Sequence, residues 1–145
     1  MVSDTQPDPD LLALIAEATK RAGLIWITVP GQGRPRPAWH IWHSGHAAAY
    51  LLTGPGEQDV PGLGGAGRVT VTVASKESGG RLVAWSARVS RVDPGSAEWA
   101  TVAGALVAGR LNAAQEPGEA SPAVRWARAG AVYRLSPVSR TSSAR

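Results

Sequence analysis

Two stretches of this 145-residue chain alternate between apolar and polar side chains with a period of two, and this limits the folds open to it. From Arg68 to Val73 the valines fall on one face and the threonines on the other, and residues 81–92 alternate in the same way. Successive side chains of a β-strand point to opposite faces. Each stretch is therefore predicted to be a strand with one buried face, joined to the other through the turn region 75–80.

The other segments predict helices on either side of a run of strands. Asp8 can cap a first helix and Gly23 can end it, and apolar residues at helical spacing predict a second helix from Asp93 to about Arg110. A short helix over 121–130 comes before the last strand. The predicted strands are 24–29, 38–43, 47–53, 68–73, 81–92 and 131–135.

This order of elements predicts a mainly β, α+β domain. A six-stranded antiparallel β-barrel with an N-terminal helix and two later helices fits it, whereas a doubly wound parallel sheet does not. We expect residues 1–138 to form this single domain, and residues 139–145 to be a flexible polar tail.

Composition and motifs exclude several classes of function. The chain has no cysteine, which excludes disulfides and thiolate chemistry. No apolar run approaches the roughly 20 residues that cross a bilayer, and the N-terminus lacks an export signal, so a cytoplasmic protein without a membrane partner is expected. The net charge of +4 comes without a basic run, so no nucleic-acid partner is predicted. No catalytic triad, phosphate-binding loop or carboxylate pair supports hydrolysis or phosphoryl transfer.

Three histidines, His40, His43 and His46, lie close together in the sequence. On a strand His40 and His43 face opposite sides, so only His43 and His46 can converge, across the turn between them. No third ligand is evident, and no metal site is predicted. His40 is interpreted instead as a residue that faces a ligand.

Tryptophan supplies six residues of a chain that has no phenylalanine. Trp26 and Trp85 are predicted to lie in the core or in a dimer interface, because other apolar groups share their faces. Trp39 and Trp42 are predicted to lie on opposite faces of one strand, so that one ring points outward. Trp99 and Trp126 lie on predicted helices and are interpreted as packing residues.

The order of several short motifs resembles one known family. A Gly-Arg-Pro-Arg-Pro loop (33–37) precedes a Trp-His-Ile-Trp strand (39–42), a hairpin, Tyr-Leu-Leu-Thr-Gly (50–54), a glycine-rich loop and the alternating Val-Thr strand. This order resembles the split β-barrel of pyridoxamine-phosphate-oxidase-like proteins, and is similar to short actinobacterial members among the flavin and deazaflavin oxidoreductases. The resemblance covers residues 22–92 well and residues 98–134 in architecture only.

The resemblance implies a six-stranded split barrel that forms a homodimer, with a flavin in each of two clefts between the subunits. The cofactor would carry most of the chemistry, moving a hydride or electrons between its ring and a small organic substrate. FMN is the leading cofactor and a deazaflavin coenzyme is the next. No catalytic residue is assigned. The predicted cofactor contacts are His40, Trp42, Thr53, Gly54, Gln58, Ser75 and Lys76.

The loop after residue 53 departs from the family pattern. Members that bind FMN usually place a lysine or Ser-Arg-Lys where this chain has Glu57 and Asp59. Two carboxylates would repel a phosphate dianion by several kcal/mol, on the order of the Coulomb energy at low effective dielectric. Either these acids point away, or the phosphate lies elsewhere, or FMN is not the ligand. Candidate replacement cations are Arg34, Arg36, Lys76 and Arg81.

Two other functions therefore stay open beside a flavin-dependent oxidoreductase. One is a ligand-binding or stress-related split-barrel module without catalytic activity. The other is a haem-binding variant, with one of the three histidines as axial ligand.

Overall fold

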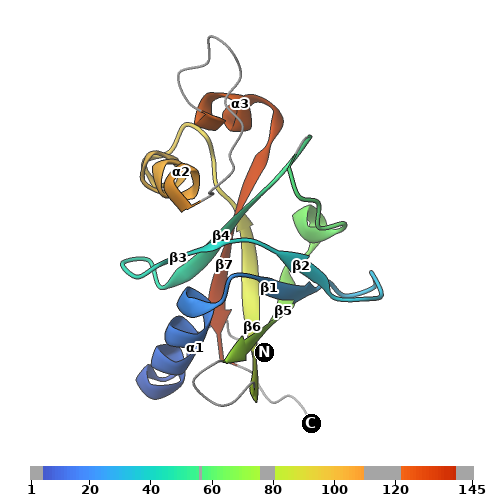
Figure 1. Ribbon diagram of the computed structural model, residues 1–145, viewed down its shortest axis with the longest axis vertical. Coiled ribbons are helices and arrows are strands. Elements are labelled where there is room, and N and C mark those ends of the chain that lie inside the picture. Colours follow the sequence, from blue (N-terminus) through green and yellow to red (C-terminus); the bar gives the residue numbers. More distant parts are fainter. Residues whose placement is uncertain (1–4, 56, 76–80, 110–121, 140–145) are drawn as a thin grey trace.

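The computed structural model describes residues 5–55, 57–75, 81–109 and 122–139 (Figure 1). The predictions for Lys76 and for the tail beyond Ser139 lie outside these residues. The elements, in chain order, are α1 (Pro9–Arg21), β1 (Ile25–Thr28), β2 (Arg36–Ala38), β3 (Ile41–His43), β4 (Ala48–Thr53), the 3-10 turn η1 (Leu63–Gly65), β5 (Arg68–Ser75), β6 (Arg81–Arg91), α2 (Ala97–Gly109), α3 (Pro122–Ala129) and β7 (Ala131–Val138).

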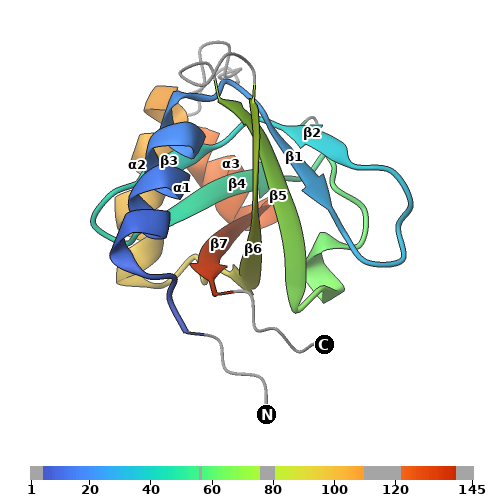
Figure 2. The same cartoon turned by 90° about the horizontal axis from the view of Figure 1, so that it is seen from below.

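One antiparallel sheet contains all seven strands, in the order β2-β1-β5-β6-β7-β4-β3. Its two edge strands, β2 and β3, are separated in the sequence only by Trp39 and His40. The sheet must therefore curl until its edges meet, and Figure 2 shows the resulting barrel-like shape. The predicted α+β class and helix arrangement are confirmed. The strand number is seven rather than six, because the predicted strand 38–43 is broken at these two residues.

Two helices begin at local capping signals, α1 after Asp8 and α2 after Ser96, three residues later than the predicted Asp93. The Asp8 carboxylate accepts a hydrogen bond from the Leu11 amide at 2.9 Å, and Pro9 occupies the first turn of α1, where a missing N–H costs nothing. In the same way, the Ser96 hydroxyl accepts from the amide of Trp99 at 3.1 Å at the start of α2. Figure 1 shows α2 and α3 together, on the other side of β3 and β4 from α1.

The curled sheet separates two apolar cores. Inside the barrel lie the inward faces of β5 and β6, where Val69, Val71, Val73, Trp85 and Ala87 are buried as the period of two predicts. The second core lies between the sheet and the helices α2 and α3. It contains Tyr50, Leu52, Trp99, Leu106 and Trp126.

Strand β4 is buried on both faces because it stands between these two cores. Ala49 and Leu51 face the barrel interior, whereas Tyr50 and Leu52 face the helices. A strand buried on both sides has an almost continuous apolar sequence, and residues 48–52 show this pattern.

Five of the six tryptophans lie where the sequence predicts them. Trp39 packs against the core beneath the helices and Trp42 against the barrel core, so they do occupy opposite faces. Trp99 and Trp126 are buried packing residues, as expected. Trp26 is 44% exposed on the outer face of β1, so it lies outside the core, and its other predicted place, a dimer interface, stays a prediction. None of the helices among the described residues is long and apolar enough to cross a membrane.

Candidate functional site

The loop that follows β4 is the candidate site that the sequence points to, and it is closed by its own backbone. The Glu57 N–H donates to the Gly54 carbonyl at 2.9 Å, and the Gly54 N–H donates to the Gln58 carbonyl at 3.4 Å. Pro55 has no N–H to offer. Among the described residues of this loop, the amides of Gly54 and Glu57 are therefore already used within the loop.

Gly54 is required by packing at this loop. Its φ of 150° lies outside the range that other residues favour, and a Cβ there would be 2.8 Å from the Cα of Gly130. The loop thus touches the backbone at the junction of α3 and β7. Thr53, which pairs with Ala131 across the sheet, is half-buried just before it.

Gln58 fastens the loop to the break between β2 and β3. Its Oε1 accepts from the Trp39 N–H at 2.9 Å, and its Nε2 donates to the carbonyls of Trp39 and Leu52, both at 3.0 Å. The side-chain amide thus pairs with the backbone of Trp39 as a neighbouring strand would. Both N–H donors of Gln58 are occupied. The structure therefore gives Gln58 an internal role, and its contact with a cofactor stays a prediction.

The two acids of this loop lie in different surroundings. The indole N–H of Trp126, a residue only 1% exposed, donates to Glu57 Oε2 at 3.2 Å, so the Glu57 carboxylate is directed toward α3. Asp59 is exposed. The amides of Gly54 and Glu57 bond within the loop and neither acid is a cation, so these groups offer no donor to a flavin phosphate.

His40 connects the broken strand to α1. Its Nε2 lies 2.7 Å from the carbonyl oxygen of Thr19, and since a carbonyl only accepts, Nε2 carries the proton. Burial lowers the pKa of His40, and the nearby carbonyls of Thr19 and Ala38 only partly oppose this. The predicted ligand-facing histidine thus holds a helix against the barrel.

The remaining predicted contacts are spread over the fold. Trp42 is half-buried and meets Trp85 edge to face, with ring centroids 6.3 Å apart. Ser75 ends β5 opposite Arg81, in a different hairpin from the β4 loop. The structure brings Thr53, Gly54 and Gln58 together at one loop. Contacts of these three residues, of Trp42 and of Ser75 with a cofactor stay predictions.

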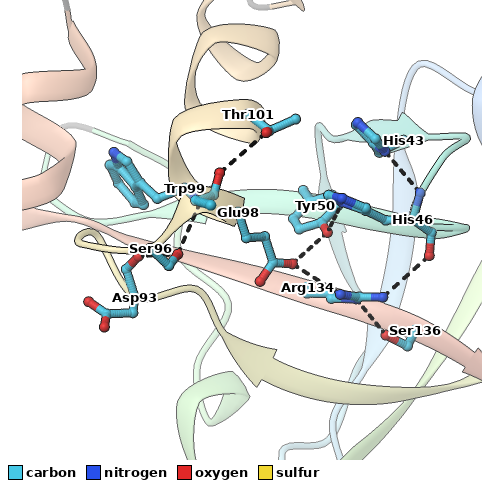
Figure 3. A network of polar contacts seen from close by, with 11 residues as sticks. His43, His46, Tyr50, Asp93, Ser96, Glu98, Trp99, Thr101, Arg134 and Ser136 are labelled. Carbon is cyan, nitrogen blue, oxygen red and sulfur yellow. Dashed lines mark hydrogen bonds and ion pairs between the residues drawn. The ribbon is translucent and has the colours of Figure 1, made fainter.

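A second polar group, which sequence reasoning missed, joins the β3–β4 hairpin to α2 and β7 (Figure 3). The Tyr50 hydroxyl donates to Glu98 Oε2 at 2.6 Å and lies 2.8 Å from His46 Nδ1. Because the single phenol proton goes to Glu98, His46 Nδ1 is the donor toward Tyr50. Burial, followed by the hydrogen bond to Glu98, raises the pKa of Tyr50 above its usual range.

Arg134 completes this network from β7. It donates to Glu98 Oε2 at 3.2 Å, to the His46 carbonyl at 3.3 Å and to the Ser136 hydroxyl at 3.0 Å. Glu98 is 48 residues from Tyr50 in sequence, and Arg134 is 88 from His46, so spacing could not pair them. The one signal in the sequence is a tyrosine within the apolar run of β4.

His43 and His46 stack with ring centroids 4.0 Å apart, and the His46 N–H donates to His43 Nδ1 at 3.0 Å. Stacked rings direct their lone pairs in parallel rather than toward one point. Among the described residues no group of three potential ligands could hold a metal ion.

The comparison with solved structures decides the fold. The haem storage protein HutZ of Vibrio cholerae superposes with a TM-score of 0.58 at 17% sequence identity, covering 94% of this chain and 93% of that one. A general stress FMN/FAD-binding protein of Xanthomonas citri gives 0.57 at 17% identity and 94% coverage of both chains. The chain has the split-barrel fold.

A third split barrel, a pyridoxamine 5'-phosphate oxidase-like protein of Listeria innocua, gives a TM-score of 0.56 at 13% identity and covers 88% of this chain and 93% of that one. The predicted resemblance to such proteins is thereby confirmed in fold. No family model matches the chain, and no curated protein matches it.

Proposed function

We propose that this split barrel is a flavin-binding protein that acts as an oxidoreductase on a small organic substrate. The observation that carries the proposal is the likeness in fold, over 94% of both chains, to a protein described as binding FMN/FAD. FMN is the first candidate and a deazaflavin coenzyme the second. When bound, such a ring would supply the hydride or electron transfer.

The chain's own part would be to hold and shield the ring. Trp42 lies on β3, the strand expected to line the ring, and Trp85 fixes it from the side. Gln58 holds the strand break and the β4 loop in one arrangement through three hydrogen bonds. A rigid wall of this kind favours binding, because little conformational freedom is lost when the ligand arrives.

We also propose a homodimer, which the outer face of β1, β5 and β6 supports. On this face Trp26 stands opposite Thr72, which in turn stands opposite Ala84. Trp26 is 44% exposed, and Leu82, on the same face of β6, is 66% exposed. Large apolar side chains exposed on one face of a sheet favour burial against a partner. In a symmetric dimer the second copy of this chain would bury the same face of both subunits.

The visible spectrum of the purified protein tests the proposal. We expect a flavin absorption band, or quenching of flavin fluorescence when the colourless protein is titrated with FMN or the deazaflavin. Absence of any change with both would contradict flavin binding. Reduction of the bound ring by candidate substrates then separates an oxidoreductase from a module that binds a flavin without turning it over.

Haem binding is a second candidate, which His46 favours. Its Nδ1–H bonds to Tyr50, which is backed by the Glu98 carboxylate, so its Nε2 is the basic atom in the neutral ring. Histidine ligands of metals commonly have such a partner on the other ring nitrogen. A Soret band on addition of haem, lost in His46→Ala and kept in His40→Gln, would support this function over the flavin.

A further inference from the structure

A groove lies on the barrel between the β1–β2 connection and the segment that leads through η1 into β5. Its volume is about 550 Å³, within the range of small-molecule sites. Figure 2 shows the two walls on the same side of the barrel. The lining residues are Val29, Pro30, Gln32, Gly62, Gly65, Ala66, Gly67 and Arg68.

The side chain of Gln32 reaches from the first wall of this groove to the second. A Cβ added at Gly62 would lie 2.8 Å from the Gln32 Cγ and 2.9 Å from its Nε2, so the carboxamide lies against the backbone of Gly62. The Gln32 N–H donates to the Val29 carbonyl at 3.0 Å, and the glycines on either side, Gly31 and Gly33, have left-handed φ values of 82° and 80°. The backbone of Gln32 is therefore held in a defined turn beside the groove.

The carboxamide of Gln32 is available to a ligand. Its side chain is exposed, and no hydrogen bond joins it to another residue in the part of the chain that the structure describes. A carboxamide offers an oxygen that accepts and an N–H that donates, side by side in one plane. The group that pairs best with Gln32 therefore carries the complementary donor and acceptor next to each other.

The two walls favour a flat ligand. A Cβ added at Gly65 or at Gly67 would meet no atom within 4 Å, and neither residue has a left-handed backbone, so neither packing nor backbone geometry requires glycine there. Glycine leaves this wall bare, and a planar ring can approach it closely. Val29 and Pro30 supply apolar surface on the other wall.

The lining favours an uncharged ligand. No carboxylate, lysine or histidine is among the described residues that line the groove. Arg68 is the one charged side chain of this set, and it already has an interaction partner in the structure. A charged ligand would lose hydration here without gaining a new counter-charge, whereas a neutral ring loses little.

We propose that the groove binds an uncharged planar ring with an amide or imide edge, as a pyrimidine base has, and that Gln32 recognises this edge. The Gln32 Nε2 would donate to a ring carbonyl, and its Oε1 would accept from the adjacent ring N–H. These two bonds would orient a ring that the apolar wall holds by contact alone. The ring system of a flavin carries the same edge, so the ligand is either a separate base or the cofactor. The site does not depend on the proposed flavin function, because a free base satisfies it equally.

Uracil is the first probe, and 1,3-dimethyluracil is the matched ligand, because its ring nitrogens carry no proton. Amide signals of the protein, followed by NMR during titration, locate the bound ring. We expect uracil to shift the signals of Gly65, Gly67 and the Gln32 side chain, and 1,3-dimethyluracil to bind about threefold more weakly or worse, as loss of a neutral hydrogen bond does. No shift at these residues with either uracil or riboflavin, or equal affinities for uracil and 1,3-dimethyluracil, would overturn the proposal.

Gln32→Leu should weaken uracil binding about three- to tenfold, because one or two neutral hydrogen bonds are lost. Gln6→Leu is the matched control, since Gln6 is also exposed but precedes α1 and does not line the groove. Neither carboxamide makes a hydrogen bond among the described residues, so both variants should melt near the temperature of the unaltered protein. Equal affinities of the two variants for uracil would contradict recognition by Gln32.

Gly67→Val tests the bare wall separately. A Cβ at this position meets no atom within 4 Å, so the variant should keep the melting temperature of the unaltered protein while the new side chain obstructs the ring. We expect weaker uracil binding. An unchanged affinity would contradict a ring seated against this wall.

Riboflavin distinguishes the two sources of the ring. If riboflavin displaces uracil and Gln32→Leu weakens the binding of both, the ring is the cofactor's own. If uracil stays bound in the presence of excess riboflavin, the groove takes a separate base. Either result supports the site and assigns its ligand, and the second does so even if the protein binds no flavin.

Discussion

The indole nitrogen of Trp126 donates to the carboxylate of Glu57 over 3.2 Å, and this bond ties α3 to the loop that follows β4. The same loop touches the chain again a few residues later, where Gly54 meets Gly130. Gly54 and Glu57 therefore serve contacts within the protein. A loop held in this way can form one wall of a ligand site, although the amides of Gly54 and Glu57 are already used within the loop.

Gly54→Ala is predicted to destabilise the protein by about 2 kcal/mol or more, because a strained φ adds to a clash with backbone. The added Cβ would lie 2.8 Å from the Gly130 Cα, which no side-chain rotation can relieve. Urea unfolding measures the change. Gly65→Ala is the control and should be nearly neutral, since its Cβ meets no atom within 4 Å. Equal losses in both variants would show that the loop does not require this close approach.

Gln58→Leu is predicted to cost about 2–4 kcal/mol of unfolding free energy, because it leaves buried backbone donors and acceptors without partners. The groups concerned are the N–H and carbonyl of Trp39 and the carbonyl of Leu52. Asp59→Asn, at the exposed neighbouring position, should change stability little. If Gln58→Leu were as stable as that control, the amide would not be what holds the strand break.

The sequence predicts the elements of this fold well because local signals determine them. The Asp8–Pro9 start of α1 and the valine alternation of β5 needed no tertiary information. The break at Trp39 and His40 could not be foreseen. The β-propensity of residues 38–43 favours one continuous strand. In the folded barrel, however, the residues before and after the break belong to β2 and β3, the two opposite edge strands of one sheet.

The candidate site was harder to predict for the same reason. Gln58 is a predicted cofactor contact, and in the structure its side-chain amide both donates and accepts hydrogen bonds. Its partners, however, are backbone groups 19 and 6 residues away, which only the folded chain brings near. The network of Tyr50, Glu98 and Arg134 draws on three elements and has no spacing signature at all.

Tyr50→Phe is predicted to cost about 1–3 kcal/mol, since it removes the phenol between His46 and Glu98 and leaves their polar groups facing an apolar ring. A double-mutant cycle with Glu98→Gln measures the coupling, which should differ clearly from zero. Additive losses would mean that the two residues act independently.

The raised pKa of Tyr50 also predicts behaviour in alkali. Its usual value is 10.0, so above that pH the unfolded chain releases the phenol proton while the folded chain keeps it. The contribution of Tyr50 to stability is therefore present below pH 10.0 and is lost as the pH rises further. A phenolate absorbance titration should show a late step that Tyr50→Phe removes. A late step that survives in the variant would assign the shift to another group.

The lowered pKa of His40 predicts the opposite pH dependence, a loss of stability at acid pH. Burial lowers its pKa below the usual 6.5, so in weak acid the unfolded chain takes up a proton that the folded chain resists. Stability from His40 is therefore present above pH 6.5 and falls as the pH drops below it. His40→Gln, whose amide can still donate to the Thr19 carbonyl, should lose less stability than the unaltered protein between neutral pH and pH about 5. Urea unfolding at several pH values measures both slopes, and equal slopes would show that His40 is not the group that titrates.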